Sequence, residues 1–166
     1  MRNTLVLILM SLSFAVTLAD DSNSVSATDK REFLALVREL PTEGELFTDK
    51  AIRKAAPHIR VLFALTKEDL EQGDIYPFAA LSAGLCRDRK YRKYGVEHFA
   101  HIAHPELKPF WAAALFGAQP PLSTEIVEYL RAALESKERS QELREIVGPG
   151  FESFKERVIQ TPPSDK

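Results

Sequence analysis

Short segments with helical periodicity, separated by proline and glycine, recur along most of the chain. The 166 residues include 10 prolines and 7 glycines. Between these breakers, apolar side chains return every three or four positions, as Phe33, Val37 and Leu40 do before Pro41. No segment alternates apolar and polar residues in the manner of a half-buried strand. The pattern therefore predicts an all-α fold.

Capping residues and breakers set the expected helix boundaries. Thr48 and Ser123 occupy N-cap positions, and Thr66 with Asp69 has the spacing of a capping box, which predicts a short helix around Leu70. Pro57 should kink or break the second segment. Besides the helix around Leu70, we expect helices in the segments 28–40, 49–63, 75–85, 91–103, 106–116, 124–134 and 151–158, with the polar stretch 136–142 either ending a helix or bridging to 143–147. Counted with the helix around Leu70, these are eight segments, in line with an expected total of about seven or eight helices.

The first nineteen residues have the organisation of a signal peptide. Arg2 precedes an apolar run that ends at Thr17-Leu18-Ala19, and the run is shorter than the roughly 20 residues that span a bilayer. We therefore expect cleavage after Ala19, no integral membrane segment after cleavage, and a secreted or periplasmic protein. The expected organisation is a signal peptide over 1–19, a flexible segment over 20–27, one all-α domain over 28–160 and a disordered tail over 161–166.

Charge and cysteine content exclude several classes of protein. The chain has 22 basic and 24 acidic side chains, which gives no general reason to expect a polyanionic partner. The single cysteine, Cys86, excludes an internal disulfide framework and a zinc site of the CxxC type. In an exported protein this thiol is expected either to be buried or to pair with another chain.

Two stretches of the chain resemble each other. They are Pro77-Phe78-Ala79-Ala80-Leu81 and Pro109-Phe110-Trp111-Ala112-Ala113, and each precedes a second amphipathic segment. The segment 104–134, with its early proline, alanine-rich first helix and leucine-bearing second helix, resembles a HEAT-type helical repeat. The resemblance implies stacked helical hairpins in an α-solenoid that binds or scaffolds a protein partner. An irregular helical bundle is the alternative.

One dense basic run and one aromatic group are candidates for partner binding. The run holds five positive side chains, Arg87, Arg89, Lys90, Arg92 and Lys93, together with two tyrosines. Because the protein is expected to be exported, nucleic acid is not an expected partner, and anionic lipid headgroups, acidic glycans or an acidic protein fit better. A solvated turn is the alternative interpretation. Trp111 is expected either in the core or, if exposed, as an anchor for a partner.

The histidines provide a second candidate chemistry. His98 and His101 are three positions apart, so both rings could face one direction and bind zinc or copper. Their spacing matches no metalloenzyme motif, and His104 is expected instead to begin the next helix beside Pro105. Ser82 lies in an apolar helical segment, which does not suit a catalytic serine. No cofactor motif or catalytic constellation is present.

The function that this sequence favours is therefore an exported, non-catalytic helical-repeat module that binds or scaffolds a protein partner. Two alternatives stay open. The first is an exported metal-binding protein that uses His98 and His101. The second is an exported enzyme whose residues come together from distant positions without forming a sequence motif.

Overall fold

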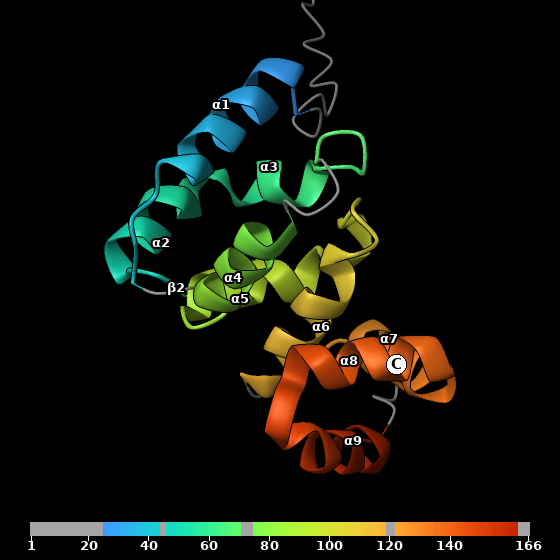
Figure 1. The fold of residues 1–166 in the computed structure, drawn as a ribbon. Coiled ribbons are helices and arrows are strands. Elements are labelled where there is room, and N and C mark those ends of the chain that lie inside the picture. The colour runs from blue at the N-terminus through green and yellow to red at the C-terminus, as the bar shows by residue number, and fades with distance from the viewer. Residues whose placement is uncertain (1–24, 44–45, 71–74, 119–121, 163–166) are drawn as a thin grey trace, which may run out of the picture.

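A computed structural model describes residues 25–43, 46–70, 75–118 and 122–162 of the chain. Within these ranges the fold is all-α, which confirms the predicted class (Figure 1). The α-helices are α1 (Ala27–Arg38), α2 (Asp49–Ala55), α3 (Ile59–Ala64), α4 (Ile75–Leu85), α5 (Arg89–Glu97), α6 (Leu107–Gly117), α7 (Thr124–Glu135), α8 (Lys137–Val147) and α9 (Phe151–Gln160). Short 3-10 helices are η2 (Ala56–His58), η3 (Phe99–His101) and η4 (Gly148–Gly150). The expected signal peptide, 1–19, and most of the expected tail lie outside the described residues.

Side-chain caps explain where several helices begin. Thr48 and Ser123 accept hydrogen bonds from backbone N–H groups at the starts of α2 and α7, as predicted. Ser136 ends α7 and caps α8, so the polar stretch that follows it belongs to a helix of its own. The first helix begins at Ala27, one residue before the expected start at 28, because Ser26 is its cap in a complete capping box.

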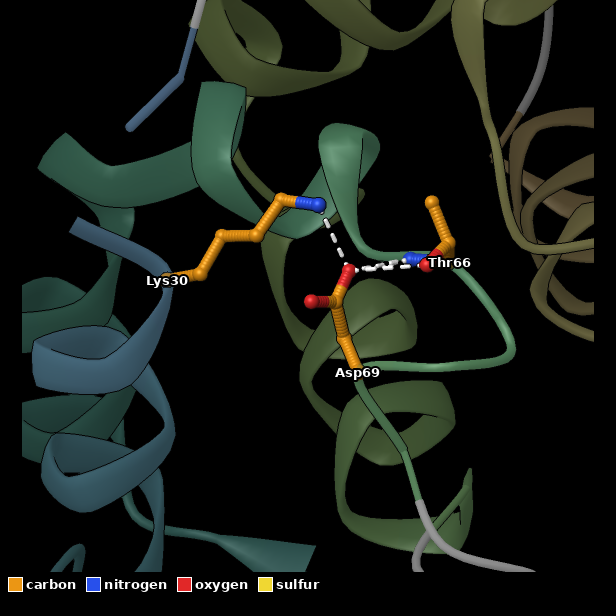
Figure 2. Close-up of polar contacts among 3 residues, drawn as sticks. All are labelled: Lys30, Thr66 and Asp69. Atoms are coloured by element: carbon orange, nitrogen blue, oxygen red, sulfur yellow. Dashed lines mark hydrogen bonds and ion pairs between the residues drawn. The ribbon is translucent and has the colours of Figure 1, made fainter. Parts of the chain in front are cut away.

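The predicted short helix around Leu70 is wrong within the described residues. The expected local hydrogen bonds do form, because Asp69 Oδ2 accepts from the backbone N–H of Thr66 at 2.8 Å and from its hydroxyl at 3.0 Å (Figure 2). They close a turn, however, with the N–H of Asp69 donating to the Thr66 carbonyl at 3.2 Å. The same carboxylate oxygen also pairs with Lys30 of α1 at 2.6 Å. Thr66 and Asp69 therefore stabilise a turn here, and the ion pair with Lys30 connects this turn to α1.

Two further details differ from the expectations. A two-residue antiparallel hairpin pairs β1 (Thr42–Glu43) with β2 (Leu46–Phe47) between α1 and α2. The segment expected as one helix over 91–103 is instead α5 followed by η3, since the backbone leaves helical geometry at His98. Pro57 interrupts the second segment as predicted, and gives α2, η2 and α3.

The helices follow one another through the molecule in chain order. In Figure 1 the blue and teal helices α1 to α3 lie at one end, and the orange and red helices α7 to α9 lie at the other. The most extensive contacts are those between α4 and α6 in the middle. One continuous apolar core, which extends from Phe33 in α1 to Val158 in α9, joins the two ends. None of the helices in the described ranges combines the length and apolar character needed to cross a bilayer.

The similarity between the stretches that begin at Pro77 and Pro109 does not correspond to a similarity in burial. Pro77 is exposed whereas Pro109 is buried, and Phe78 is buried whereas Phe110 is half-buried. The HEAT-type interpretation therefore gains no support from the environments of the paired residues.

Candidate binding surfaces

An open apolar groove of about 1020 Å³ lies among the described residues. Its floor is formed by α4 and α6, which pack side by side. Phe47 of the hairpin and Phe154 of α9 contribute to its sides, together with residues of α8 and η4. The groove therefore lies over the middle of the molecule, with residues from both ends in its lining.

Small side chains form the floor of this groove in matching positions on two helices. In α4 they are Ala79, Ala80 and Ala83, and in α6 they are Ala113, Ala114 and Gly117. Both sets have the spacing i, i+1 and i+4, which places their members on one helical face. The groove thus matches Ala79 with Ala113, whereas the sequence similarity matches Ala79 with Trp111. Because these side chains are short, the helix backbones lie close to the surface of the floor.

Two larger side chains give the groove its specific features. Tyr76, at the start of α4, is 70% exposed and is one of two large apolar side chains that stand out from the described surface. Arg157 of α9 also lines the groove, and its guanidinium lies 5.3 Å from the centre of the Phe116 ring. It is the one charged residue in the lining among the described residues. The groove thus combines an apolar floor with a single positive side chain.

The predicted basic run divides into free and engaged side chains. Arg87, Arg89 and Lys90 are exposed, and none of them lines the groove. Arg92 is half-buried and donates to the carbonyl of Ala118 at 2.6 Å, where it caps the end of α6.

Lys93, the last member of the run, is 3.6 Å from Glu97 in an exposed pair one helical turn away. Arg92 is bonded to α6 and Lys93 is paired with Glu97. The other three positive side chains of the run, Arg87, Arg89 and Lys90, form no hydrogen bond or ion pair among the described residues.

Trp111 is a core residue and is not exposed to a partner. Its exposed fraction is 0%, and its ring packs edge-on against Phe63 with centroids 4.8 Å apart. The interpretation of Trp111 as a partner anchor is therefore corrected, since the packing of α5 and α6 encloses it. The indole N–H has no hydrogen-bond partner among the described residues.

His98 and His101 do come together, with ring centroids 5.8 Å apart. The described residues contain no group of three or more His, Cys, Asp or Glu side chains that could hold a metal ion. His104 lies apart from the pair, and its Nδ1 accepts a hydrogen bond from the N–H of Glu106 at 3.2 Å. Burial lowers the pKa of His104, which keeps this ring neutral.

Neither Cys86 nor Ser82 has an environment that suits nucleophilic chemistry. Cys86 is buried and free, and burial raises the pKa of its thiol to about 12, although the charge of Arg92 opposes that shift. Ser82 is buried within α4 and donates its hydroxyl to the carbonyl of Phe78 at 2.8 Å. It therefore satisfies its own hydrogen bond inside a helix.

The groove residues were not recognised from the sequence. Tyr76, Arg157 and the small residues of the floor carry no motif, and only the repeated alanine spacing in two apolar segments could have indicated a shared face. Comparison with protein-family models, with curated proteins and with solved structures found no match to this chain. Any functional conclusion therefore has to come from the geometry of the chain itself.

Proposed function

We propose that this protein is an exported, non-catalytic module that binds a protein partner, and that the groove over α4 and α6 receives an amphipathic helix of that partner. The observation that carries the proposal is the groove itself, about 1020 Å³ of open apolar surface. The organisation of residues 1–19 supports export. Amphipathic helices bind in hydrophobic grooves of this kind in many complexes.

The dimensions and the floor of the groove favour a helix as the occupant. A helix about 10 Å wide and two to three turns long has a volume on the order of 1000 Å³. Alanine and glycine on the floor allow a second helix to approach closely, because no long side chain separates the two backbones. Tyr76 at the rim supplies an exposed aromatic side chain of the type that dominates interface energetics.

Charge defines the chemistry of the expected partner. Arg157 is the one charged group in the described lining, so a bound helix with an Asp or Glu beside it would gain a charge-assisted hydrogen bond. We therefore expect apolar residues at intervals of three and four along the partner helix, with an acidic residue at the end that reaches α9.

Site-specific photocrosslinking of the full chain in its native host tests this proposal. A photoreactive phenylalanine analogue replaces Tyr76, and the same analogue replaces Ile159 as a control. Both side chains are exposed, at 70% and 60%, but only Tyr76 lines the groove. We expect the analogue at 76 to label one partner within an amphipathic, acidic helical peptide, and the analogue at 159 to leave that peptide unlabelled.

Two matched alanine variants then test whether the groove is responsible. Ala83 and Ala132 are both exposed, on α4 and α7, and only Ala83 lines the groove. Ala83→Arg should reduce the crosslink at least about fivefold by filling the groove, whereas Ala132→Arg should leave it unchanged. Equal labelling from positions 76 and 159, or full labelling with Ala83→Arg, would contradict the proposal.

A further inference from the structure

A second pocket, distinct from the groove, brings together positive and ionisable side chains from two segments of the chain, 58–60 and 98–101. It has a volume of about 320 Å³. His58 of η2, Arg60 of α3, His98 at the end of α5 and His101 of η3 all line it. The sequence indicated only the last two histidines as a pair. Folding brings His58 and Arg60 to them from a part of the chain that precedes α4.

Aromatic packing holds the histidine rings at this pocket. The His98 ring lies 4.2 Å from that of Tyr94, centre to centre, and 5.8 Å from that of His101. His58, which also lines the pocket, stacks its ring on Phe33 with centroids 5.8 Å apart. Rings positioned by packing keep their nitrogen atoms available, because the contacts involve ring faces and edges and not hydrogen bonds.

These side chains have no competing partners among the described residues. Neither the three histidines nor Arg60 forms a side-chain hydrogen bond or an ion pair there. One carboxylate, that of Asp29 in α1, also lines the pocket. Hydrogen bonds from Ser26 chiefly lower the pKa of Asp29, with a smaller contribution from the charge of His58, so Asp29 is ionised and partly engaged elsewhere.

The neighbouring charges leave the pocket positive in acid. Lys93 and Glu97 on the adjacent turn of α5 pair with each other at 3.6 Å and largely cancel. Against the single negative charge of Asp29 there are then one permanent positive charge, on Arg60, and three histidines. Histidine is the side chain that gains a proton between about pH 8 and pH 5. With all three rings protonated, the lining would present four positive side chains to one carboxylate.

From this arrangement we propose that the pocket binds a tetrahedral oxyanion, the phosphate or sulfate group of a small molecule, and that acidification strengthens the binding. Imidazolium and guanidinium N–H groups are the donors that such oxygens require. The volume corresponds to about ten water molecules at about 30 Å³ each, enough for the anionic group and part of its substituent. The site is independent of the groove, since the two linings share no residue.

Calorimetric titration of the full chain with sodium sulfate at constant ionic strength tests this proposal. Sulfate is chosen first because it stays dianionic across the range, so a change in affinity reports the protein alone. We expect binding at about pH 5.5 that weakens about tenfold or more by about pH 8, as the histidines lose their protons. A parallel titration with sodium phosphate at about pH 5.5 separates a site for either anion from one that accepts sulfate alone, and the sulfate titrations supply the pH profile that supports the proposal.

Variants assign the binding to these residues. His98→Gln with His101→Gln should abolish most of the pH dependence, whereas Arg60→Gln should weaken binding about threefold at both pH values, because arginine does not titrate. Arg89→Gln with Lys90→Gln removes two exposed positive charges outside the pocket and serves as the control. Should the double histidine variant fail to fold, His58→Gln, at an exposed position, provides the same test.

The proposal is overturned by affinity that does not change between the two pH values, by unchanged binding in the histidine variants, or by an equal loss in the Arg89→Gln and Lys90→Gln control. The last result would mean that sulfate responds to net charge alone. None of these outcomes bears on the groove, whose partner is read from the crosslinks.

Discussion

Burial decides the chemistry of Cys86. The sequence left this thiol either buried or paired with another chain, and its position beside three exposed positive residues would favour the thiolate if it were exposed. In the structure only 2% of the residue is exposed, and burial raises the thiol pKa to about 12.

We therefore predict that Cys86 of the native protein does not react with a disulfide reagent at about pH 8, because the reactive species is the thiolate. The unfolded chain should react at one thiol per molecule, since it has one cysteine. Absorbance of the released thiolate measures both reactions. Rapid labelling before unfolding, or a chain that migrates as a disulfide-linked dimer, would contradict the buried environment.

A glycine in α5 allows Trp111 to pack closely. A Cβ atom added at Gly95 would lie 3.0 Å from Trp111 Cζ3 and 3.2 Å from Leu115 Cδ2, whereas a Cβ atom at Gly117 would have no neighbour within 4 Å. The two glycines therefore have opposite expected responses to alanine, although both lie in helices.

Gly95→Ala should destabilise the protein by about 1 kcal/mol, because overpacking outweighs the gain in helix propensity. Gly117→Ala should stabilise it by about 0.5 kcal/mol through the unfolded state. Urea unfolding of the two variants measures both values. Equal stabilities would show that α5 does not lie as close to Trp111 as the structure places it.

Single residues also show where sequence reasoning ends. The five positive residues between 87 and 93 are equivalent in sequence, yet Arg92 caps the end of α6 through Ala118, 26 residues later. His58 and His98 meet in one pocket although α3, α4 and α5 lie between them in the chain. Contacts of this range depend on how the helices pack, and no local pattern contains that information.

At the scale of helices, local signals were informative as long as the surrounding chain supported them. Thr48, Ser123 and Pro57 mark real boundaries, because an N-cap or a proline acts on the backbone within one turn. The signal at Thr66 and Asp69 produced a turn, because the Asp69 carboxylate is shared with Lys30, 39 residues earlier.

The contact between α1 and this turn leads to a prediction about ion pairs. Lys30 and Asp69 are about four-fifths buried and lie 2.6 Å apart, whereas Lys93 and Glu97 are exposed and lie 3.6 Å apart. Lys30→Gln should lower the free energy of unfolding by about 1–2 kcal/mol, because it leaves the partly buried Asp69 carboxylate with one strong donor fewer. The matched change Lys93→Gln should lower the free energy of unfolding by less than about 0.5 kcal/mol. Denaturant unfolding measures both, and similar losses would contradict the ranking.

The same carboxylate should make part of the stability depend on pH. Burial alone would raise the pKa of Asp69, but hydrogen bonds from Lys30 and Thr66 outweigh it and hold the pKa below the ordinary value of 3.8. The folded state therefore binds this proton less readily than the unfolded state does. The stability that ionised Asp69 contributes is thus fully present above about pH 4, and it is lost as the pH falls through the lowered pKa. The stability difference between the unmodified protein and Asp69→Asn should narrow below about pH 4, and a difference that does not change with pH would contradict this linkage.

At the scale of the whole molecule, periodicity predicted the all-α class and most of the helices, but not which faces would meet. The groove places Ala79 of α4 and Ala113 of α6 in matching positions, whereas the visible similarity matched Ala79 with Trp111. The sequence similarity pairs residues of the same type, whereas the groove pairs residues that lie in the same environment. A resemblance between segments can therefore exist without placing the same residues in the same environment.

The continuous core gives the last prediction, which concerns how the molecule unfolds. Solenoids are stabilised by contacts between neighbouring repeats, so their ends can unfold separately from their middle. Here one apolar cluster joins α1 to α9, and Trp111, the one tryptophan, belongs to it and is 0% exposed. Unfolding should therefore be a single transition, with tryptophan fluorescence and far-ultraviolet circular dichroism giving the same midpoint in urea. A dichroism midpoint clearly below the fluorescence midpoint would show that the ends unfold first and would favour repeat-like stacking over a bundle with one core.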